Sequence, residues 1–238
     1  MGVQTKTPRL FTQYKTLLKK DLHLELRTKE MLTSMGIYAF LVLIVFGASL
    51  AQNSSSQDIL HMSGGLLWVL IVFTSLLGLN RSFSHEKEHA CMEGMLLAPM
   101  DRSMIFLAKA TSNLVFLCIV EIITIPFFYF FFLTTTNPAD TFWLIVAPLF
   151  VGTIGIAGIG TLLSTITLNT RGKDVLLAVL FIPLIFPLLY ACVSATTVAI
   201  VGNEFFADVF YPSICLAGVY DVVMLLLSWV LYDFVISA

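Results

Sequence analysis

The segment His85-Glu86-Lys87-Glu88-His89 contains an HExxH pattern, which is the arrangement in this chain that comes nearest to catalytic chemistry. In zinc proteases, two histidines four residues apart on one helix face bind the metal, and the glutamate polarises a water molecule. That helix is packed beneath the active site, so charged residues such as Lys87 and Glu88 do not suit it. Glu93 could act as a third ligand, but we expect no further cytoplasmic domain to form a substrate cleft. We therefore predict no metal site and interpret the segment as a solvated loop that faces a partner.

Two carboxylates, Glu121 and Asp221, interrupt long apolar tracts. An ionised side chain inside a membrane costs about 2.5 to 3.5 kcal/mol on insertion scales, so each should face a protein interior or a wet cavity. Each carboxylate could line a transport pathway. Alternatively, each could pair with a hydroxyl group or lie at a subunit interface and contribute only to packing.

His61, with Met62 beside it, lies near one end of another apolar tract. Imidazole and thioether groups both bind haem iron, so His61 is a candidate haem ligand. A single unpaired histidine is a weak signal, and we predict no cofactor bound by this chain.

Prolines and glycines also occur inside the apolar tracts. Pro126, Pro183 and Pro187 remove helix hydrogen bonds and predict kinks. Gly152, Gly155, Gly158 and Gly160 include spacings of small residues that allow two helices to approach closely. We expect these glycines to serve packing.

The elements that must position these residues begin with an amphipathic segment at residues 9–30. Its apolar face carries Leu10, Tyr14, Leu17, Leu18, Leu22 and Leu26, and its basic residues lie mostly on the other face. This pattern predicts a helix lying on the membrane surface, in contact with lipid.

Six apolar tracts follow, each at least as long as the roughly 20 residues that a membrane-spanning helix needs. They cover residues 31–51, 60–80, 105–134, 141–168, 175–200 and 213–236. The chain is therefore predicted to be one all-α transmembrane domain, 1–238, with residues 81–104 as its long charged loop.

Basic residues predict the orientation of the spans. With six spans, residues 52–59, 135–140 and 201–212 share one side and contain no Lys or Arg. All 13 basic residues lie on the other side or at its membrane edge. Both termini are therefore expected in the cytoplasm.

The composition supports a membrane protein and excludes several other classes. Apolar residues make up 58% of the 238 residues, charged residues make up 12%, and the mean hydropathy is +0.93. A soluble globule, a disordered chain, a collagen-like repeat and a coiled coil are all excluded. The sequence has no GxxxxGK[ST] motif, so the chain is not expected to hydrolyse ATP through a P-loop, and it shows no nucleic-acid-binding character.

Two groups of segments carry a family resemblance. The first runs from Leu67-Trp68 to Phe83 and continues through Met92-Glu93-Gly94-Met95-Leu96-Leu97-Ala98-Pro99 and Ala108-Lys109. The second comprises Val151-Gly152-Thr153, Arg171-Gly172 and Ile182-Pro183-Leu184-Ile185-Phe186-Pro187-Leu188-Leu189. Together they resemble the CcmB family, the membrane subunit of the ABC-type haem exporter complex of cytochrome c maturation.

This resemblance implies a multi-pass permease of the bacterial inner membrane with an ABC-2-type layout. Its implied partners are a second copy of the chain, a cytoplasmic ATPase that binds ATP, a haem-handling membrane protein and a periplasmic haem chaperone. By similarity to ABC-2 permeases, residues 81–104 would contact the ATPase, with Phe83, Glu86, Glu93 and Pro99 as the coupling residues.

Three functions are compatible with these features. The first is a permease subunit that uses ATP hydrolysis by its partner to export haem or to release a haem-loaded chaperone. The second is an ABC-2-type permease that exports a lipid, glycan or drug. The third, an ion-coupled transporter using Glu121 and Asp221, lacks support because no inverted repeat is apparent between the halves of the chain.

Overall fold

Seven helices make up the part of the chain that the computed structural model describes, residues 10–53, 55–88, 102–133, 138–167, 170, 172–202 and 206–237. They are α1 (Leu10–Thr28), α2 (Glu30–Asn53), α3 (Ser56–Glu88), α5 (Arg102–Phe132), α6 (Pro138–Thr167), α7 (Lys173–Val201) and α8 (Phe206–Ser237). No strand occurs within these residues, and six of the helices are long and apolar enough to cross a membrane. The predicted all-α fold with six spans is confirmed.

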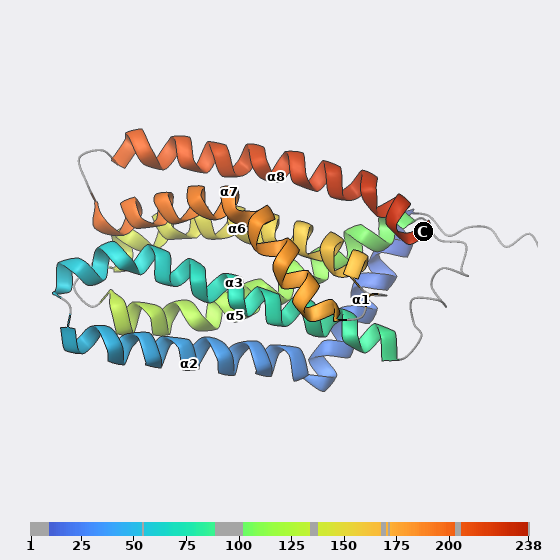
Figure 1. Cartoon of the computed structure of the whole chain (residues 1–238), viewed down its shortest axis with the longest axis horizontal. Coiled ribbons are helices and arrows are strands. Elements are labelled where there is room, and N and C mark those ends of the chain that lie inside the picture. Colours follow the sequence, from blue (N-terminus) through green and yellow to red (C-terminus); the bar gives the residue numbers. More distant parts are fainter. Residues whose placement is uncertain are drawn as a thin grey trace, which may run out of the picture.

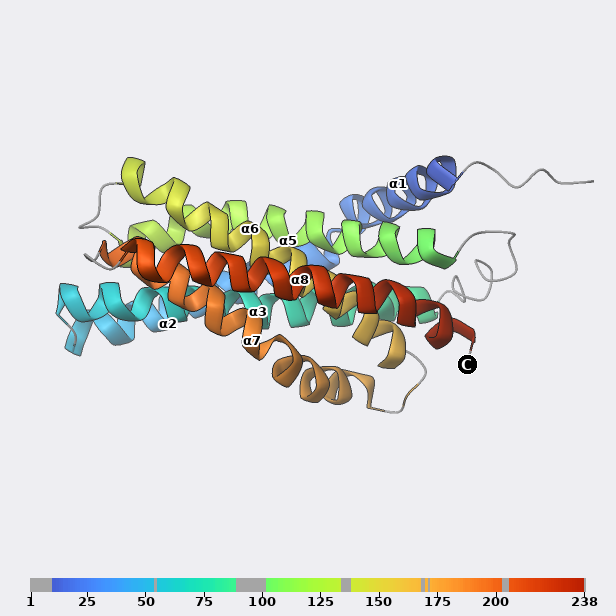
Figure 2. The same cartoon turned by 90° about the horizontal axis from the view of Figure 1, so that it is seen from above.

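The six long helices run side by side along one axis, while the shorter α1 lies at one end of the bundle (Figure 1). Consecutive long helices alternate in direction, and the end of α8 lies at the same end of the bundle as α1 (Figures 1 and 2). An even number of crossings therefore returns the chain to the side on which it begins.

Helix α6 packs extensively within the bundle, where it contacts α3, α5, α7 and α8. Its glycines allow these contacts to be close. A Cβ atom at position 152 would lie less than 3.0 Å from the ring of Trp68, and one at position 158 would come equally close to the side chain of Leu225. Gly155 and Gly160 are just as crowded. The packing role predicted for this glycine series is confirmed.

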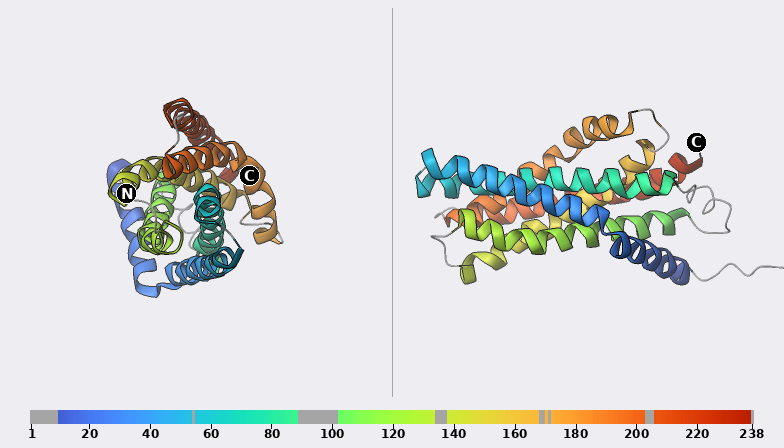
Figure 3. Two further views of the ribbon diagram at one scale, coloured as in Figure 1. Left: turned by 90° about the vertical axis from the view of Figure 1, so that its left-hand side faces the viewer. Right: turned by 90° about the horizontal axis from the view of Figure 1, so that it is seen from below.

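Helix α7 bends near the middle of its length, and its first half leaves the bundle (Figures 2 and 3). Pro183 and Pro187 lie in this middle part of the helix. A proline lacks the N–H that would bond the carbonyl four residues earlier, and its ring clashes with that carbonyl. The bend thus lies where the two prolines are expected to produce it, and Pro126 lies inside α5.

Helix α1 turns sharply into α2 at Lys29, which has a left-handed backbone with a φ of 56°. The Glu25 carboxylate caps α2, because its Oε1 accepts hydrogen bonds from the backbone N–H of Met31 at 2.8 Å and of Leu32 at 3.2 Å. Gln13 and Leu17 are buried as α1 packs on α5. One face of α1 therefore covers protein, and the location of the helix on the membrane surface stays a prediction.

Helix α3 extends further than its span. It has 33 residues, which corresponds to about 50 Å, whereas the hydrocarbon core of a bilayer is about 30 Å thick. Its last turns, up to Glu88, enter the segment 81–104 that the sequence analysis treats as a loop. Helix α8 begins at Phe206 rather than at the predicted 213, and contains Pro212 near its start.

Candidate functional site

Glu121 of α5 is half-buried and contacts a hydroxyl group on the neighbouring α6. Thr153 Oγ1 donates a hydrogen bond to Glu121 Oε1 at 2.7 Å, and the same hydroxyl oxygen lies 2.8 Å from the Leu149 carbonyl oxygen. A hydroxyl has one proton, so Thr153 can donate to one of these acceptors at a time. Glu121 therefore shares the single Thr153 proton with a backbone carbonyl, and the carboxylate is only partly satisfied by its own chain.

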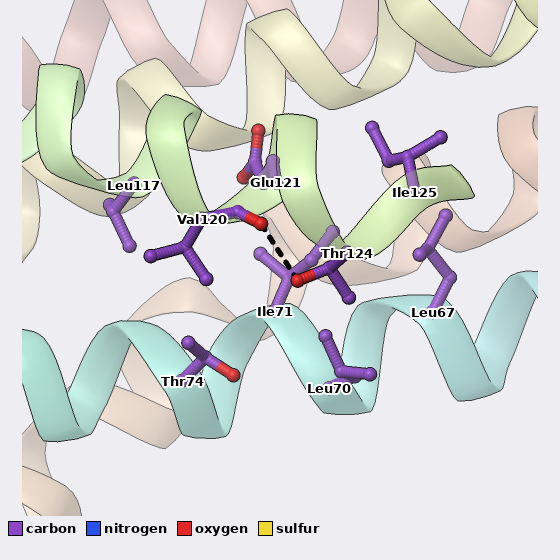
Figure 4. A pocket seen from close by; sticks show the side chains of 9 residues that line it. All are labelled: Leu67, Leu70, Ile71, Thr74, Leu117, Val120, Glu121, Thr124 and Ile125. Atoms are coloured by element: carbon purple, nitrogen blue, oxygen red, sulfur yellow. Dashed lines mark hydrogen bonds between the residues drawn. The ribbon is translucent and has the colours of Figure 1, made fainter. Parts of the chain in front are cut away.

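The Glu121 side chain projects away from α3, whereas Leu117 and Val120 on the same helix point toward α3 (Figure 4). Between α3 and α5, Glu121, Thr74, Thr124 and apolar side chains line a cavity of only about 10 Å³. That volume is at the lower limit for a single water molecule. The bundle interior beside Glu121 is thus packed, and the carboxylate faces elsewhere.

On its other side, Glu121 lines a groove between α5 and α6. This groove, which we call the α5–α6 groove, has a volume of about 940 Å³. Its lining residues are Cys118, Glu121, Ile122, Ile125, Pro126, Tyr129, Phe142, Trp143, Val146, Leu149 and Phe150. Most of them are apolar or aromatic, and Glu121 is the one carboxyl group among them, with the Tyr129 hydroxyl and the Cys118 thiol as further polar groups.

Asp221 of α8 has a different environment, because it is only 5% exposed. It lies against α6 at a glycine: a Cβ atom at position 155 would be less than 3.0 Å from Asp221 Oδ1. Leu188 of α7 lies beside the same glycine. Among the described residues, no group donates a hydrogen bond to Asp221 Oδ1. The Asp221 carboxyl group is therefore enclosed in a notch formed by α6 and α7.

The two carboxylates do not share one site. Glu121 contacts Thr153 and Asp221 contacts Gly155, so both lie at nearly the same level along α6. Residues two positions apart in an α-helix point in directions that differ by about 200° around the axis, so these two contacts lie on opposite faces of α6. A continuous pathway through a single chain that uses both groups is not supported by this arrangement.

Several polar contacts between helices were missed by sequence reasoning, and three of them involve buried side chains. Lys109 Nζ of α5 forms a nearly buried ion pair with Asp21 Oδ2 of α1 at 3.1 Å. Trp68 Nε1 donates to Thr196 Oγ1 at 2.9 Å, and Asn113 Nδ2 donates to Thr161 Oγ1 at 2.9 Å. The presence of these residues in apolar helices was a signal that each needs a partner, but the sequence does not say which helix supplies it.

The structure describes the remaining candidates only in part. Phe83, Glu86 and His85 lie on the last turns of α3, and their side chains are outside the described part of the structure. The segment 89–101, which includes Glu93, Pro99 and His89, also falls outside it. His61 lies on the surface of α3. In the described residues, no three His, Cys, Asp or Glu side chains form a group that could hold a metal ion.

One known protein family matches most of this chain. The model of a family described as "CcmB protein" matches residues 12–231, from α1 into the last turns of α8. The chain belongs to the CcmB family. This membership confirms the resemblance found in the sequence, and the match includes every one of the six candidate spans at least in large part.

Relatives within the family are similar over most of their length. Heme exporter protein B of Pseudomonas aeruginosa is 27% identical over 176 residues, which cover 74% of this chain and 77% of that protein. Heme exporter protein B of Paracoccus denitrificans is 26% identical over 205 residues, covering 85% and 91% respectively. The protein of the same name from Rhodobacter capsulatus is 23% identical over 175 residues, covering 74% and 78%.

Proposed function

We propose that this chain is the membrane permease subunit of a haem exporter complex that acts in cytochrome c maturation. The observation that carries this proposal is its CcmB-family membership, together with relatives named as heme exporter proteins that align over most of their length. The six-span bundle supports a role within the membrane. Export of a lipid, glycan or drug is not favoured, because none of these relatives is named for such a substrate.

A separate cytoplasmic ATPase supplies the energy in this proposal. The sequence lacks a P-loop motif, so the nucleotide must be bound by a partner. Helix α3 is long enough to project beyond the bilayer, and its last turns form the first part of the charged segment 81–104. The coupling contact is assigned to this segment, through Phe83, Glu86, Glu93 and Pro99.

The proposed orientation places both termini in the bacterial cytoplasm. Its support is the absence of Lys and Arg from residues 52–59, 135–140 and 201–212, combined with an even number of spans. Single cysteines at Ser55, Asp140 and Asn203 should react with an impermeant maleimide added to intact cells, and cysteines at Lys87 and Lys173 should not. External labelling at Lys87 would reverse the orientation.

The complex in this proposal contains a second copy of the chain, a haem-handling membrane protein and a periplasmic haem chaperone, all within or beside the lipid of the inner membrane. Haem is the cargo or the handled ligand, and this chain holds no cofactor of its own. ATP binding to the ATPase can shift the permease between two conformations only if the contacts at the coupling segment differ between the two states.

The decisive experiment is charge reversal in the coupling segment of the complete complex. Glu86→Lys combined with Glu93→Lys should reduce the ATPase that co-purifies with the membrane subunit at least tenfold and abolish cytochrome c formation at a normal level of inserted protein. Asp208→Lys, a reversal of an exposed charge at the start of α8, is the matched control and should retain both. If the double variant keeps the ATPase and still supports cytochrome c formation, the coupling assignment is wrong.

A further inference from the structure

The α5–α6 groove contains an unsatisfied acceptor that is open to the outside of the bundle. Glu121 Oε1 accepts the hydrogen bond from Thr153, whose proton is shared with a carbonyl, while Oε2 has no hydrogen bond within the described residues and is not enclosed by protein. No ion pair joins Glu121 to a described Lys, Arg or His. The groove therefore presents a carboxylate that its own chain leaves without a full-time donor or a cation.

The depth of Glu121 limits what can supply the missing donor. Glu121 lies 11 residues before Phe132, the end of α5, which corresponds to about 16 Å along the helix axis. Since the hydrocarbon core is about 30 Å thick, the carboxylate lies near the middle of the membrane. Lipid head groups remain at the membrane surface, and acyl chains offer no donor. Ordinary lipid therefore cannot satisfy this group.

The walls of the groove suit a helix. Ile122 is 70% exposed and Trp143 is 73% exposed, and Phe150 on α6 also faces outward. These side chains form an apolar rim on both sides of the carboxylate, over a length of several helical turns. Inside a membrane, helices associate through close packing combined with a small number of polar contacts, and this groove provides both.

We propose that the α5–α6 groove is the docking site for a transmembrane helix of a different subunit, and that this helix donates a hydrogen bond or presents a cation to Glu121 at mid-membrane depth. The donor is a Lys, Arg or His, or a hydroxyl or amide side chain. A second copy of this chain that docked groove to groove would bring two Glu121 carboxylates together about the twofold axis, so that arrangement is disfavoured. An anionic amphiphile is disfavoured by the same repulsion.

The proposal rests on the chain working within a membrane complex, as proposed above, and photo-crosslinking in that complex tests it. A benzophenone amino acid replaces Ile122 in the groove, and in a matched control it replaces Val222, which is 58% exposed on α8. Irradiated native membranes are analysed by peptide mass spectrometry. The Ile122 position should form adducts with a membrane-spanning peptide of another chain that carries a polar donor within one turn of the attachment point.

Variants of Glu121 then separate docking from general packing. Glu121→Leu should lower the adduct yield at position 122 at least tenfold, whereas Glu121→Gln, which keeps an acceptor oxygen, should retain more of it. The yield at position 222 should not change in either variant. Co-purification of the ATPase and the thermal midpoint of the subunit are measured in parallel for every variant, and a general loss of folding would lower both together with the adduct yield at position 222.

Several results would overturn the docking proposal. These are adducts at position 122 with lipid alone, adducts with a second copy of this chain, or equal adduct yields from the unaltered protein and the Glu121→Leu variant. If any of them occurs while the ATPase still co-purifies and cytochrome c still forms, only the groove assignment fails. The coupling-segment variants test the proposed function in a separate experiment, through loss of the ATPase and of cytochrome c formation. A failure of the groove assignment therefore does not affect that test.

Discussion

The two carboxylates inside the membrane spans are accommodated in opposite ways. Asp221 is enclosed, fits a notch that exists only because residue 155 is glycine, and has an oxygen without a hydrogen-bond partner in the described structure. Glu121 is half-buried, shares a hydroxyl proton with a backbone carbonyl and opens into a large groove. The first arrangement suits packing within one chain, and the second suits association with another.

The ion pair between Lys109 and Asp21 differs from both Glu121 and Asp221, because here a nearly buried charge has a partner of opposite charge within the same chain. Breaking a buried pair costs about 3 to 5 kcal/mol, since the remaining charge stays buried. Lys20 lies 3.6 Å from the same carboxylate and should limit the loss, so we expect Lys109→Met to cost about 3 kcal/mol. The measurement is the thermal unfolding midpoint in detergent.

Arg81→Ala is the matched control for this prediction. Arg81 and Glu30 also form an ion pair, at 3.5 Å, but both side chains are more than half exposed. Such pairs contribute about 1 kcal/mol or less. Equal losses for Lys109→Met and Arg81→Ala would show that the buried pair does not hold α1 on the bundle.

The notch beside Asp221 can be tested through its glycine. Gly155→Ala places a methyl group less than 3.0 Å from both Asp221 Oδ1 and the Leu188 side chain, and overpacking of this kind costs about 1 to 3 kcal/mol. Gly218→Ala on α8, where a Cβ atom would meet nothing within 4 Å, should leave the unfolding midpoint unchanged or slightly higher. Adding Asp221→Ala to Gly155→Ala should recover much of the loss, because the two groups compete for one space. Strict additivity of the two changes would contradict the notch.

The sequence predicted the helical class, the number of spans and the need to shelter both carboxylates. Each of these follows from a short stretch of sequence, namely the length of an apolar tract or the presence of a carboxylate within it. The sequence could not predict the different surroundings of the two carboxylates. Thr153 and Gly155 lie two residues apart on α6, and only the packed bundle shows that α5 contacts one and α8 the other. Likewise, Asp21 looks like an ordinary charge of an amphipathic helix until α1 is placed against α5.

The predicted loop at 81–104 shows a different kind of limit. Polar residues after Asn80 end the apolar tract, which marks the membrane boundary but not the end of the helix. Helix α3 continues to Glu88, because a helix that is already formed can extend into water, and Glu86 and Lys87 have a good intrinsic preference for the helix. Hydropathy therefore predicted where the membrane span ends, whereas the helix propensity of the following residues determines where helix α3 ends.

The smallest expected effects compare the two carboxylates directly. Asp221→Asn keeps the shape of the side chain and removes a buried charge that has no described partner for Oδ1, so stability should stay equal or rise by up to about 1 kcal/mol. Glu121→Gln keeps an acceptor for Thr153, and its free energy of unfolding should change by less than about 1 kcal/mol. Both are read from unfolding midpoints of the isolated subunit. A loss above about 1 kcal/mol for Asp221→Asn would mean that the carboxylate itself makes a stabilising contact. The proposed difference between Asp221, which only packs within its chain, and Glu121, which contacts another subunit, would then be wrong.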